Sequence, residues 1–446
     1  MCASAAVDYR RGAPCSADDA PGAGVADAAA IDPPDEPTET ADLVEPERFS
    51  RIRLASDNDA QRALTNAPKM SELFLADEFI ARHGRRWRYV KEWGAWYQFD
   101  NGWRLDELGS IKAAVSDMLR EAGDWQAAQA LSAANRRKLC AHSTVTGVMS
   151  FIASHATIST PAAEWDRDPY LLGVADGYYV DLRTGVRDVA WPHLLISRRC
   201  AVLPEPGEPS MWLAHLNMVL RGDQAAIGFL RRYLGYMLTG EIGEHALVFL
   251  YGQGRNGKGT VVETVIRILG DYGYAAPVNL LMESKQERHP VELAMLRGRR
   301  AVSCSEPPQG SRWDDGRIRS LTGGDTITAR RMNQDLSSFS PTHKLILMGN
   351  HKPTLRSVDE AVRSRFNILD FSYTIPTDQR DPHFMEKLRA EWPQILNWMI
   401  GGCMEWLEGG LGKPLSMVES TREYLQDEDV MGSFLAECCE IGRAHV

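Results

Sequence analysis

Short runs of apolar residues recur along the second half of the chain, separated by stretches with helical or irregular patterns. The runs occupy residues 246–251, 301–304, 345–348 and 366–371. Continuous apolar runs of this kind are typical of strands that are buried on both faces, as the strands of a parallel sheet are. We therefore predict an α/β fold with a mainly parallel sheet, and we expect its chemistry at the carboxyl ends of those strands.

The first half of the chain has a different pattern, which predicts a smaller α+β domain. A capped helix is expected to begin near Ser71, and helical patterning resumes over residues 111–152. Between them, residues 96–103 predict a hairpin with a tight turn. This region holds a cluster of aromatic residues, namely Trp87, Tyr89, Trp93, Trp96, Tyr97, Phe99 and Trp103. Two interpretations of the cluster stay open: the aromatic core of a small sheet, or a surface that stacks on single-stranded bases.

Residues 1–66 are rich in Ala, Asp, Pro and Gly and contain almost no aromatic residues. Such a segment cannot bury enough apolar surface to offset its ordering entropy, so we predict a disordered acidic tail. Of the net charge of −10, residues 1–50 carry −8 (eleven acids against three arginines), which leaves −2 for residues 51–446. The folded part is therefore close to neutral, and the acidic composition says little about its partners.

The composition also indicates in which cellular compartment the protein is expected. No run of about 18 apolar residues occurs, so we expect no membrane-spanning helix, and the first residues lack the basic and apolar segments of a secretory signal. The eight cysteines form no CxxC pair. This pattern argues against a disulfide framework or a zinc site and favours reduced thiols in the cytoplasm.

The first apolar run leads into a glycine-rich loop that is followed by a helical pattern over residues 261–269. The loop reads Gly252-Gln253-Gly254-Arg255-Asn256-Gly257-Lys258-Gly259-Thr260. In a strand–loop–helix of this type, backbone N–H groups converge on phosphate oxygens, and the lysine reaches the β- and γ-phosphates. The strict pattern places Ser or Thr directly after the lysine to ligate magnesium, whereas here Gly259 holds that position and Thr260 follows. We predict a nucleotide site with Thr260 as a magnesium ligand; the alternative is a glycine-rich turn without a ligand.

Polar residues follow two further apolar runs. Glu306 follows residues 301–304, and Asn350 follows residues 345–348. Taken alone, each is ordinary, because a solvated carboxylate or a turn amide often ends a strand. The carboxyl ends of parallel strands meet at one edge of a sheet, however, so Lys258, Glu306 and Asn350 are predicted to form one site. There Glu306 would hold magnesium or a water, and Asn350 would sense the γ-phosphate or orient the attacking water.

The segment between these residues is rich in arginine. Residues 297–331 contain eight arginines and four acids, a net charge of +4, which favours contact with a nucleic-acid backbone without base readout. We take Arg319, Arg330 and Arg331 as candidate DNA contacts. Two apolar–polar stretches flanking residues 333–335 are expected to pair as a hairpin. A charged surface that is merely solvated remains the alternative.

These residues together resemble a known family. The run from 251 to 371 resembles the superfamily 3 helicase domain of phage- and plasmid-encoded primase/helicases, a group that includes poxvirus-type NTPases. The resembling stretches are residues 252–260, 305–307, 318–330, 345–353 and 359–365. The aromatic cluster also looks like the domain that precedes the ATPase in that family, so the resemblance covers roughly residues 70–440.

The resemblance implies a P-loop (AAA+-like) ATPase core that uses ATP and Mg²⁺. It also implies a ring, expected to be a hexamer, that translocates along single-stranded DNA and unwinds duplex DNA at forks. Such proteins serve the replication of a phage, prophage or plasmid in the cytoplasm of a bacterial host. A primase or another replication protein is an expected partner. Primase activity is not expected of this chain itself, because the segment before residue 70 is too short and too disordered to fold a primase module. Two other functions stay open: a P-loop ATPase that loads or remodels another helicase, and a DNA-binding replication scaffold with weak ATPase activity.

Carried over position by position, the resemblance assigns a role to each candidate residue. Lys258 matches the phosphate-loop lysine, Glu306 the acidic second motif and Asn350 the sensor amide. Arg365 looks like the arginine finger that completes a neighbouring subunit's site. The family more often has an adjacent arginine pair where this chain has Arg363-Ser364-Arg365, so Arg363 is a rival for that role.

The expected organisation follows from these patterns. The boundaries are a disordered tail at 1–66, an α+β domain at 67–203, a helical collar at 210–243, the ATPase domain at 244–375, a helical segment at 376–431 and the start of a C-terminal domain at 432–446. Residues 441–446 read like the translation of a sequencing-adapter stretch. We expect that they are an artefact and that the natural protein continues; the alternative is a genuine short tail.

Overall fold

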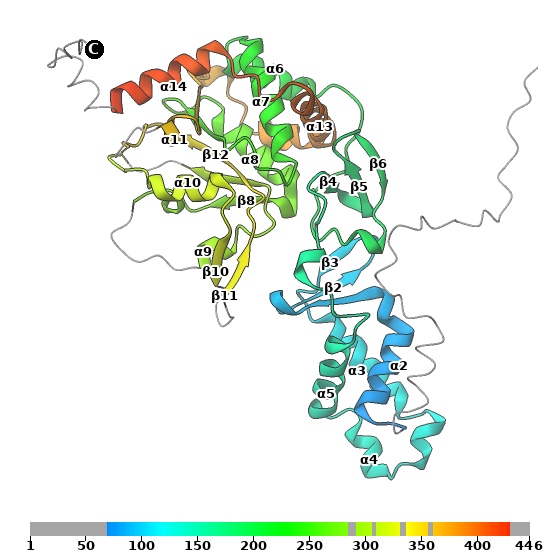
Figure 1. The fold of residues 1–446 in the computed structure, drawn as a ribbon. Coiled ribbons are helices and arrows are strands. Elements are labelled where there is room, and N and C mark those ends of the chain that lie inside the picture. The colour runs from blue at the N-terminus through cyan, green and yellow to red at the C-terminus, as the bar shows by residue number, and fades with distance from the viewer. Residues whose placement is uncertain (1–68, 284–290, 306–308, 331–335, 356–359, 429–446) are drawn as a thin grey trace, which may run out of the picture. The chain divides into compact units, whose positions relative to one another are not determined.

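The computed structural model describes residues 69–283, 291–305, 309–330, 336–355 and 360–428. The tail predicted at 1–66 and the segment at 432–446 lie outside these ranges. Figure 1 shows the order of the elements along the chain. Within the described ranges, no helix is both long and apolar enough to cross a membrane.

The N-terminal part contains helices and two small antiparallel sheets. Helix α2 (Glu72–His83) begins as predicted, with the Ser71 side chain accepting a hydrogen bond from the Phe74 backbone N–H at 3.2 Å. The first sheet has the order β1-β2-β3 and the second the order β4-β5-β6. The elements are β1 (Trp87–Val90), β2 (Ala95–Phe99), β3 (Trp103–Leu105), α3 (Ser110–Ala122), α4 (Ala133–Lys138), α5 (His142–Ser154), β4 (Leu171–Gly173), β5 (Tyr178–Asp181) and β6 (Val186–Val189).

The aromatic cluster forms a packed core, which is the first of the two interpretations offered above. Tyr97 and Trp103 are buried together with Trp165, and the Tyr97 and Trp165 ring centroids lie 4.6 Å apart. The Trp103 indole N–H donates to the Pro192 carbonyl at 2.8 Å. The predicted hairpin is also present as β2 and β3, with Phe99 opposite Trp103.

The second half of the chain is built on one parallel sheet with the strand order β13-β7-β12-β9-β8. The strands are β7 (Leu247–Tyr251), β8 (Gly273–Ala276), β9 (Ala301–Ser305), β12 (Lys344–Gly349) and β13 (Phe366–Asp370). Four of them coincide with the apolar runs, so the predicted parallel sheet is confirmed. Strand β8, at one edge, was not predicted, because its short Gly-Tyr-Ala-Ala sequence makes no continuous apolar run.

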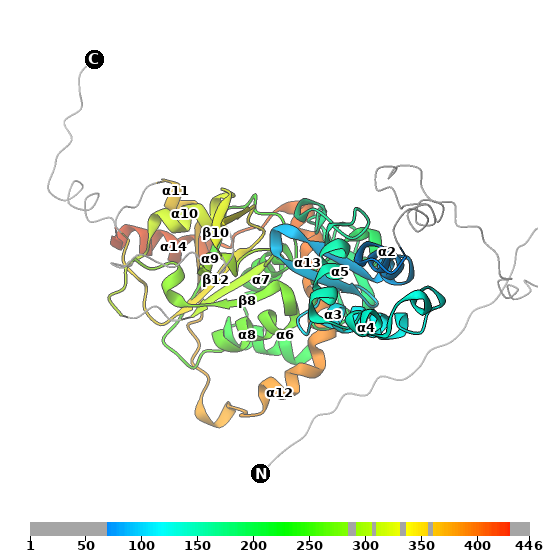
Figure 2. The same ribbon diagram turned by 90° about the horizontal axis from the view of Figure 1, so that it is seen from below.

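Helices cover both faces of this sheet, as Figure 2 shows for α6 and α8 on one side and α10 and α14 on the other. Alternate residues of β7 point to opposite faces: Val248 and Leu250 belong to one core cluster, and Leu247 and Phe249 to the other. The helices are α6 (Ser210–Val219), α7 (Gln224–Met237), α8 (Lys258–Leu269), α9 (Val291–Ala294), α10 (Asp315–Gly323), α11 (Glu360–Arg363), α12 (Phe384–Leu388), α13 (Trp392–Gly409) and α14 (Leu415–Glu428).

The segments predicted as a helical collar and as a C-terminal helical segment share one core with the sheet. Helices α7 and α13 approach closely at glycine: a Cβ on Gly235 would lie 2.1 Å from the Cys403 backbone nitrogen. Helix α6 is tied to the residue before α13, because the Glu391 carboxylate accepts the Met211 and Trp212 backbone N–H groups at 3.0 Å each. Both segments therefore pack directly against the elements that carry the glycine-rich loop.

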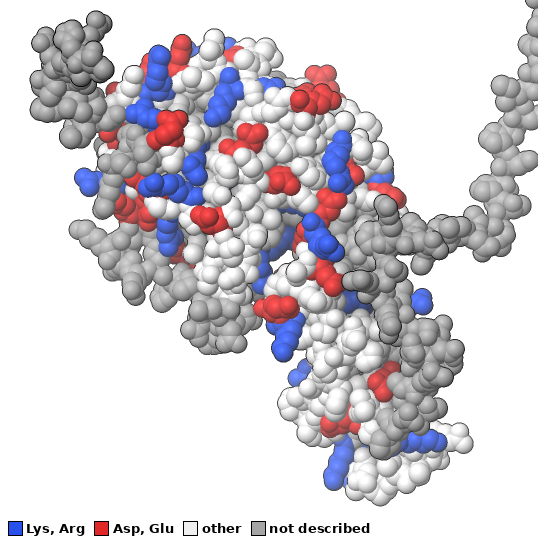
Figure 3. All heavy atoms as spheres, viewed as in Figure 1, with Lys and Arg blue, Asp and Glu red and all other residues white. Residues whose placement is uncertain are grey.

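The predicted hairpin is formed by β10 (Ile327–Arg330) and β11 (Leu336–Phe339), which pair antiparallel beside α9 (Figure 1). The turn between the two strands lies outside the described ranges. Figure 3 shows basic and acidic side chains interspersed over the face in view. That distribution agrees with the near-neutral charge of residues 51–446.

Candidate functional site

The glycine-rich loop joins β7 to α8 at the carboxyl edge of the sheet. Its backbone is left-handed at Gly254 (φ +97°), Arg255 (φ +52°) and Gly257 (φ +79°). Glycine suits two of these positions because a residue without a Cβ adopts positive φ at little cost. Gly252 meets a second requirement, since a Cβ there would lie 2.4 Å from the Phe371 carbonyl oxygen. The loop is thus shaped by close backbone approach as well as by turns.

Lys258 is the first residue of α8, and its side chain is buried. Its ammonium group donates to the Gly252 carbonyl at 2.7 Å, to Asn256 Oδ1 at 2.9 Å and to Asn350 Oδ1 at 3.1 Å. The structure therefore brings Lys258 and Asn350 together from the ends of two neighbouring strands, as the sequence predicts. A cation that bonds to neutral oxygens in front of a helix N-terminus can attract a phosphate group.

Asn256 anchors the loop to the chain that follows β13. It is 2% exposed, and its side-chain amide donates to the Phe371 carbonyl at 2.8 Å while its oxygen accepts from Lys258. Phe371 directly follows β13, and the Ile375 backbone N–H donates to the Arg255 carbonyl at 3.0 Å. The sequence places Asn256 in the loop but does not reveal this anchoring contact, which joins residues 115 positions apart.

Helix α6 supports the loop from a second side, and no pattern in the sequence predicts this support. The His215 ring packs against Gly257: Nε2 lies 3.5 Å from the Gly257 carbonyl, and a Cβ on Gly257 would lie 2.7 Å from two ring atoms. The Phe384 ring lies 5.1 Å from the His215 ring, centroid to centroid. Burial lowers the pKa of His215, so its imidazole stays neutral near neutral pH.

The candidate magnesium ligands are described in part. Gly259 is exposed, and a Cβ there would meet no atom within 4 Å, whereas Thr260 is half-buried in the first turn of α8. Glu306 lies outside the described ranges, directly after the last residue of β9, Ser305. Magnesium is usually bound by one or two protein ligands together with phosphate oxygens and water. A hydroxyl at Thr260 and a carboxylate at Glu306 fit that donor set.

Arg365 is not brought to the loop of its own chain. It precedes β13, and its carbonyl accepts from the Leu247 N–H that begins β7, so it lies at the amino edge of the parallel sheet. Strand β7 has five residues, and each residue of a strand spans about 3.3 Å, so roughly 17 Å separate this edge from the glycine-rich loop. Its guanidinium donates to Thr322 Oγ1 at 3.0 Å and to the Ala361 carbonyl. Arg363 ends α11 and is partly exposed.

The candidate DNA contacts are dispersed. Arg319 is partly buried on α10, where its Nε donates to the Asp315 carbonyl at 3.3 Å. Arg330 ends β10, and its side chain and all of Arg331 lie outside the part of the chain that is described. The hairpin is confirmed, with Thr328 Oγ1 and Ser338 Oγ 3.0 Å apart across its two strands. Its contact with DNA stays a prediction.

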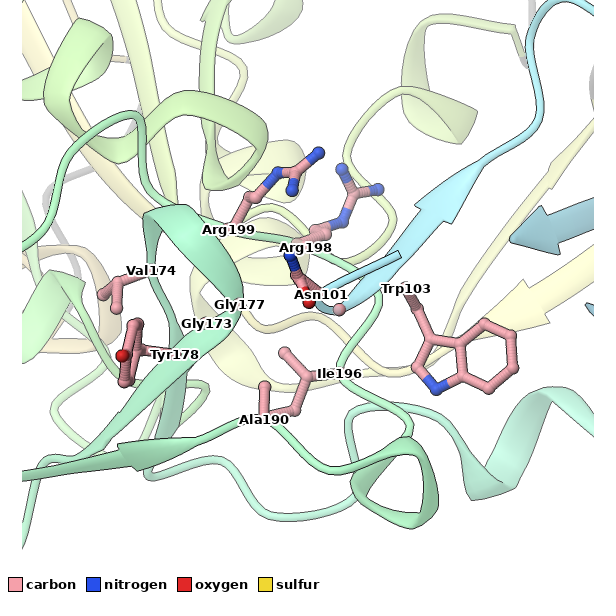
Figure 4. A pocket seen from close by; sticks show the side chains of 11 residues that line it. Asn101, Trp103, Gly173, Val174, Gly177, Tyr178, Ala190, Ile196, Arg198 and Arg199 are labelled. Atoms are coloured by element: carbon pink, nitrogen blue, oxygen red, sulfur yellow. The ribbon is translucent and has the colours of Figure 1, made fainter. Parts of the chain in front are cut away.

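A small cavity in the N-terminal part is no alternative nucleotide site. It lies where the turn after β2 meets β4 and β5, and its volume is about 20 Å³, enough for about one water molecule. Figure 4 shows the guanidinium groups of Arg198 and Arg199 pointing away from Ala190 and Ile196. A cavity of this size is too small for a nucleotide phosphate group, so it does not compete with the glycine-rich loop as a phosphate site.

Two family models and several viral relatives match parts of the chain. Residues 74–221 match the family described as D5 N terminal like, and residues 250–365 match a family of unknown function, DUF5906. A relative named "Putative helicase L207/L206", from Acanthamoeba polyphaga mimivirus, is 26% identical over 296 residues, which are 61% of this chain and 31% of that protein. Another, named "Putative helicase 022R", from Frog virus 3, is 23% identical over 240 residues, 48% of this chain and 24% of that protein.

The chain thus spans less than a third of either viral relative's length. Among solved structures, the apo structure of the NrS-1 C terminal region aligns with a TM-score of 0.49 and 11% identity, covering 79% of this chain and 75% of that one. The family and sequence matches confirm the resemblance to primase-helicases that the sequence predicts.

Proposed function

We propose that this chain, which carries the D5 N terminal like domain of the primase-helicase family, is an ATP-dependent DNA helicase. It would hydrolyse ATP to translocate on single-stranded DNA and unwind duplex DNA during the replication of a phage, prophage or plasmid. The observation that carries the proposal is the contact between Lys258 and Asn350 on a glycine-rich loop that opens a helix. The relatives named as helicases support the DNA-directed part of the proposal.

In the proposed mechanism, the residues of the loop do most of the binding. Backbone N–H groups over residues 252–260 and the N-terminus of α8 would bind the phosphates of ATP. Lys258 would exchange its present oxygen partners for β- and γ-phosphate oxygens, and Asn350, released from the ammonium, would turn its amide to the γ-phosphate or to the attacking water. Asn256 would keep the loop anchored to the end of β13 during this exchange.

Magnesium, when bound, would neutralise charge that develops on the phosphates. We assign Thr260 and Glu306 to hold it, with Glu306 also near the attacking water. Arg365 would act on the site of a neighbouring subunit in a ring, because its own loop lies at the other edge of the sheet. The hairpin β10–β11 and its arginines would contact single-stranded DNA by its backbone.

One feature favours a second candidate function. Gly259 occupies the position at which the strict loop pattern has a hydroxyl residue, as it would in a replication scaffold whose nucleotide site is weak. A loader or remodeller of another helicase would hydrolyse ATP without separating strands. ATP turnover stimulated by single-stranded DNA separates the helicase from the scaffold, and strand displacement separates it from the loader.

The experiment is unwinding of a forked duplex by the purified chain, with ATP turnover measured alongside. Lys258→Ala should lower turnover by about 10²–10³-fold or more and abolish unwinding, because it removes the cation that stabilises charge on the transferred phosphoryl group. Lys112→Ala, an exposed lysine of α3, is the matched control and should behave as wild type. Near-normal turnover by Lys258→Ala would overturn the site, and ATP turnover without strand separation would favour the loader.

A further inference from the structure

Helices α4 and α5 carry a surface that the proposed nucleotide site does not use. Residues 125–163 contain no Asp or Glu, although 60 acids in 446 residues would place about five in a segment of that length. The segment includes three successive cations, Arg136, Arg137 and Lys138, which we call the α4 cations. Because the segment itself holds no carboxylate, it presents only positive or neutral side chains to an approaching polyanion.

The α4 cations are exposed, and α4 buries none of its side chains. In the described ranges, none of the three pairs with a carboxylate. Helix α3, which packs against α5, carries Asp117 and Glu121, and these acids form ion pairs with Arg120 and Arg82. The positive charge at the end of α4 is therefore not neutralised by its neighbours.

The start of α5 adds to this positive region. Thr144 Oγ1 donates to the Lys138 carbonyl at 2.9 Å, which fixes the end of α4 against the first turn of α5. Helix α5 has thirteen residues, and no side chain caps its N-terminus. The unpaired backbone N–H groups of that turn carry a partial positive charge beside the α4 cations.

One face of α5 presents short polar side chains to solvent. The exposed residues on it are Ser143, Thr146, Ser150 and Ser154, whose spacing of three, four and four residues places them along one line of the helix. We call them the α5 hydroxyl stripe. Glu72 of α2, which lies against Gly147, borders the stripe and limits it on that side. Short hydroxyl side chains allow close approach to phosphate and sugar oxygens. Thr146 and Ser154 donate to carbonyls of their own helix, so Ser143 and Ser150 are the members of the stripe proposed as donors to DNA.

A purely structural role explains only some of these features. Cations at the C-terminus of a helix stabilise its dipole, and the α4 cations are placed for that. Helix α4 has only six residues, however, and a helix dipole explains neither the absence of acids over residues 125–163 nor the α5 hydroxyl stripe. A binding surface for a phosphate backbone explains all of these features together.

We propose that the α4 cations and the α5 hydroxyl stripe bind the phosphate backbone of duplex DNA. The inference rests on the proposed function and places the double-stranded part of its substrate. Duplex is favoured over single strands because proteins that bind single strands stack the bases on several aromatic rings. Within residues 125–163 the Trp and Phe residues are Trp125 and Phe151, and the Arg82 guanidinium covers the Trp125 ring at 4.6 Å.

The test is fluorescence anisotropy of a labelled 20-base-pair duplex and of one of its strands, titrated with the full chain at several salt concentrations. The α4 variant carries Arg136→Gln, Arg137→Gln and Lys138→Gln. Each lost phosphate contact lowers the slope of log affinity against log salt by about 0.9, so three lost contacts lower it by up to about 2.7. We expect duplex affinity to fall at least about tenfold near 0.1 M salt and single-strand affinity to change less than about twofold.

Two further variants sharpen the result. The first is a control variant that carries Arg187→Gln, Arg389→Gln and Arg422→Gln. It loses the same charge, but from exposed positions that have an acid within two residues, and it should bind duplex as wild type does. Ser143→Glu with Ser150→Glu places negative charge on the α5 hydroxyl stripe while α4 is untouched, and it should lose duplex affinity as well. Thermal melts establish that each variant is folded.

The inference fails if the folded α4 variant keeps the wild-type duplex affinity and salt slope. It also fails if duplex and single-strand affinities fall equally, because the surface would then not distinguish them. ATP turnover of wild type and Lys258→Ala, measured without DNA, reports on the nucleotide site separately. If the wild-type chain hydrolyses ATP, Lys258→Ala does not, and the α4 variant binds duplex normally, then the proposed function stands and the proposed duplex-binding surface is refuted.

Discussion

The position of Arg365 makes a quantitative prediction about assembly. Its carbonyl is bonded to the first residue of β7, while Lys258 follows the last residue of that strand, so the two lie at opposite edges of the sheet. The separation of roughly 17 Å along the strand exceeds the reach of an arginine side chain. If Arg365 completes a phosphoryl-transfer site, that site must belong to another subunit.

Mixing two inactive chains tests this. Arg365→Ala alone and Lys258→Ala alone should each lose most ATP turnover, since an arginine finger contributes about 10³–10⁵ in rate. In a 1:1 mixture, a site is complete when its own chain keeps Lys258 and its neighbour keeps Arg365. Each condition has a chance of one half, so about a quarter of the interfaces, and about 25% of wild-type turnover, should be restored whatever the size of the ring.

The assay is steady-state ATP turnover of mixtures assembled over a range of ratios, with the two chains carrying different labels to establish that they co-assemble. Arg363→Ala mixed with Lys258→Ala is the matched control: Arg363→Ala should already be active alone, so mixing should only dilute it. Removing the Arg365 bond to Thr322 costs about 1 kcal/mol of stability, which thermal melts would detect. Absence of rescue in assemblies shown to be mixed would refute a finger acting between subunits at Arg365.

Three further predictions concern the loop and the sheet. Thr260→Ala should lower magnesium-dependent turnover by about 10²-fold or more, while Gly259→Ser is tolerated because a Cβ there meets open space; equal activity of the two variants would refute the one-residue shift of the magnesium ligand. Gly257→Ala should weaken ATP binding about 10–100-fold in equilibrium titrations, because the alanine is strained at positive φ and clashes with His215. Adding His215→Gly to this variant should relieve the clash but not the strain. Burial lowers the pKa of His343 to about 4 from 6.5, so the unfolded chain binds a proton at this residue before the folded chain does. The free energy of unfolding is therefore unaffected by this residue above pH 6.5 and falls by about 3 kcal/mol as the pH drops from 6.5 to 4. Denaturant melts of His343→Leu should show a flatter pH dependence.

The parts of the fold that follow from local pattern were predictable. Strands β7, β9, β12 and β13 are continuous apolar runs because both faces of the sheet are covered, and such runs are visible in the sequence. Strand β8 was missed because an edge strand of small residues needs no such run. The contact of Lys258 with Asn350 was predictable for a topological reason, since residues that follow adjacent parallel strands meet at one edge.

The supports of the loop were not predictable in this way. Asn256 reaches the carbonyl of Phe371, and Gly257 packs on His215, across 115 and 42 positions of the chain. Neither pair has a local pattern that marks it: an asparagine in a loop and a histidine on an apolar helix face are ordinary residues in sequence. Their importance arises only from packing, which places α6 and the end of β13 against the loop.

The sheet's topology connects the predicted site to the predicted assembly. In this parallel sheet, a residue directly before a strand and a residue that follows the neighbouring strand lie at opposite edges, roughly 17 Å apart along the five residues of β7. Lys258 and Asn350 follow their strands, and Arg365 precedes its strand. A catalytic part for Arg365 therefore requires a second copy of the chain, because strand direction and strand length together keep it from the loop of its own chain. If Arg365 instead serves only its bonds to Thr322 and Ala361, Arg365→Ala will lower stability and leave the turnover of the folded chain unchanged.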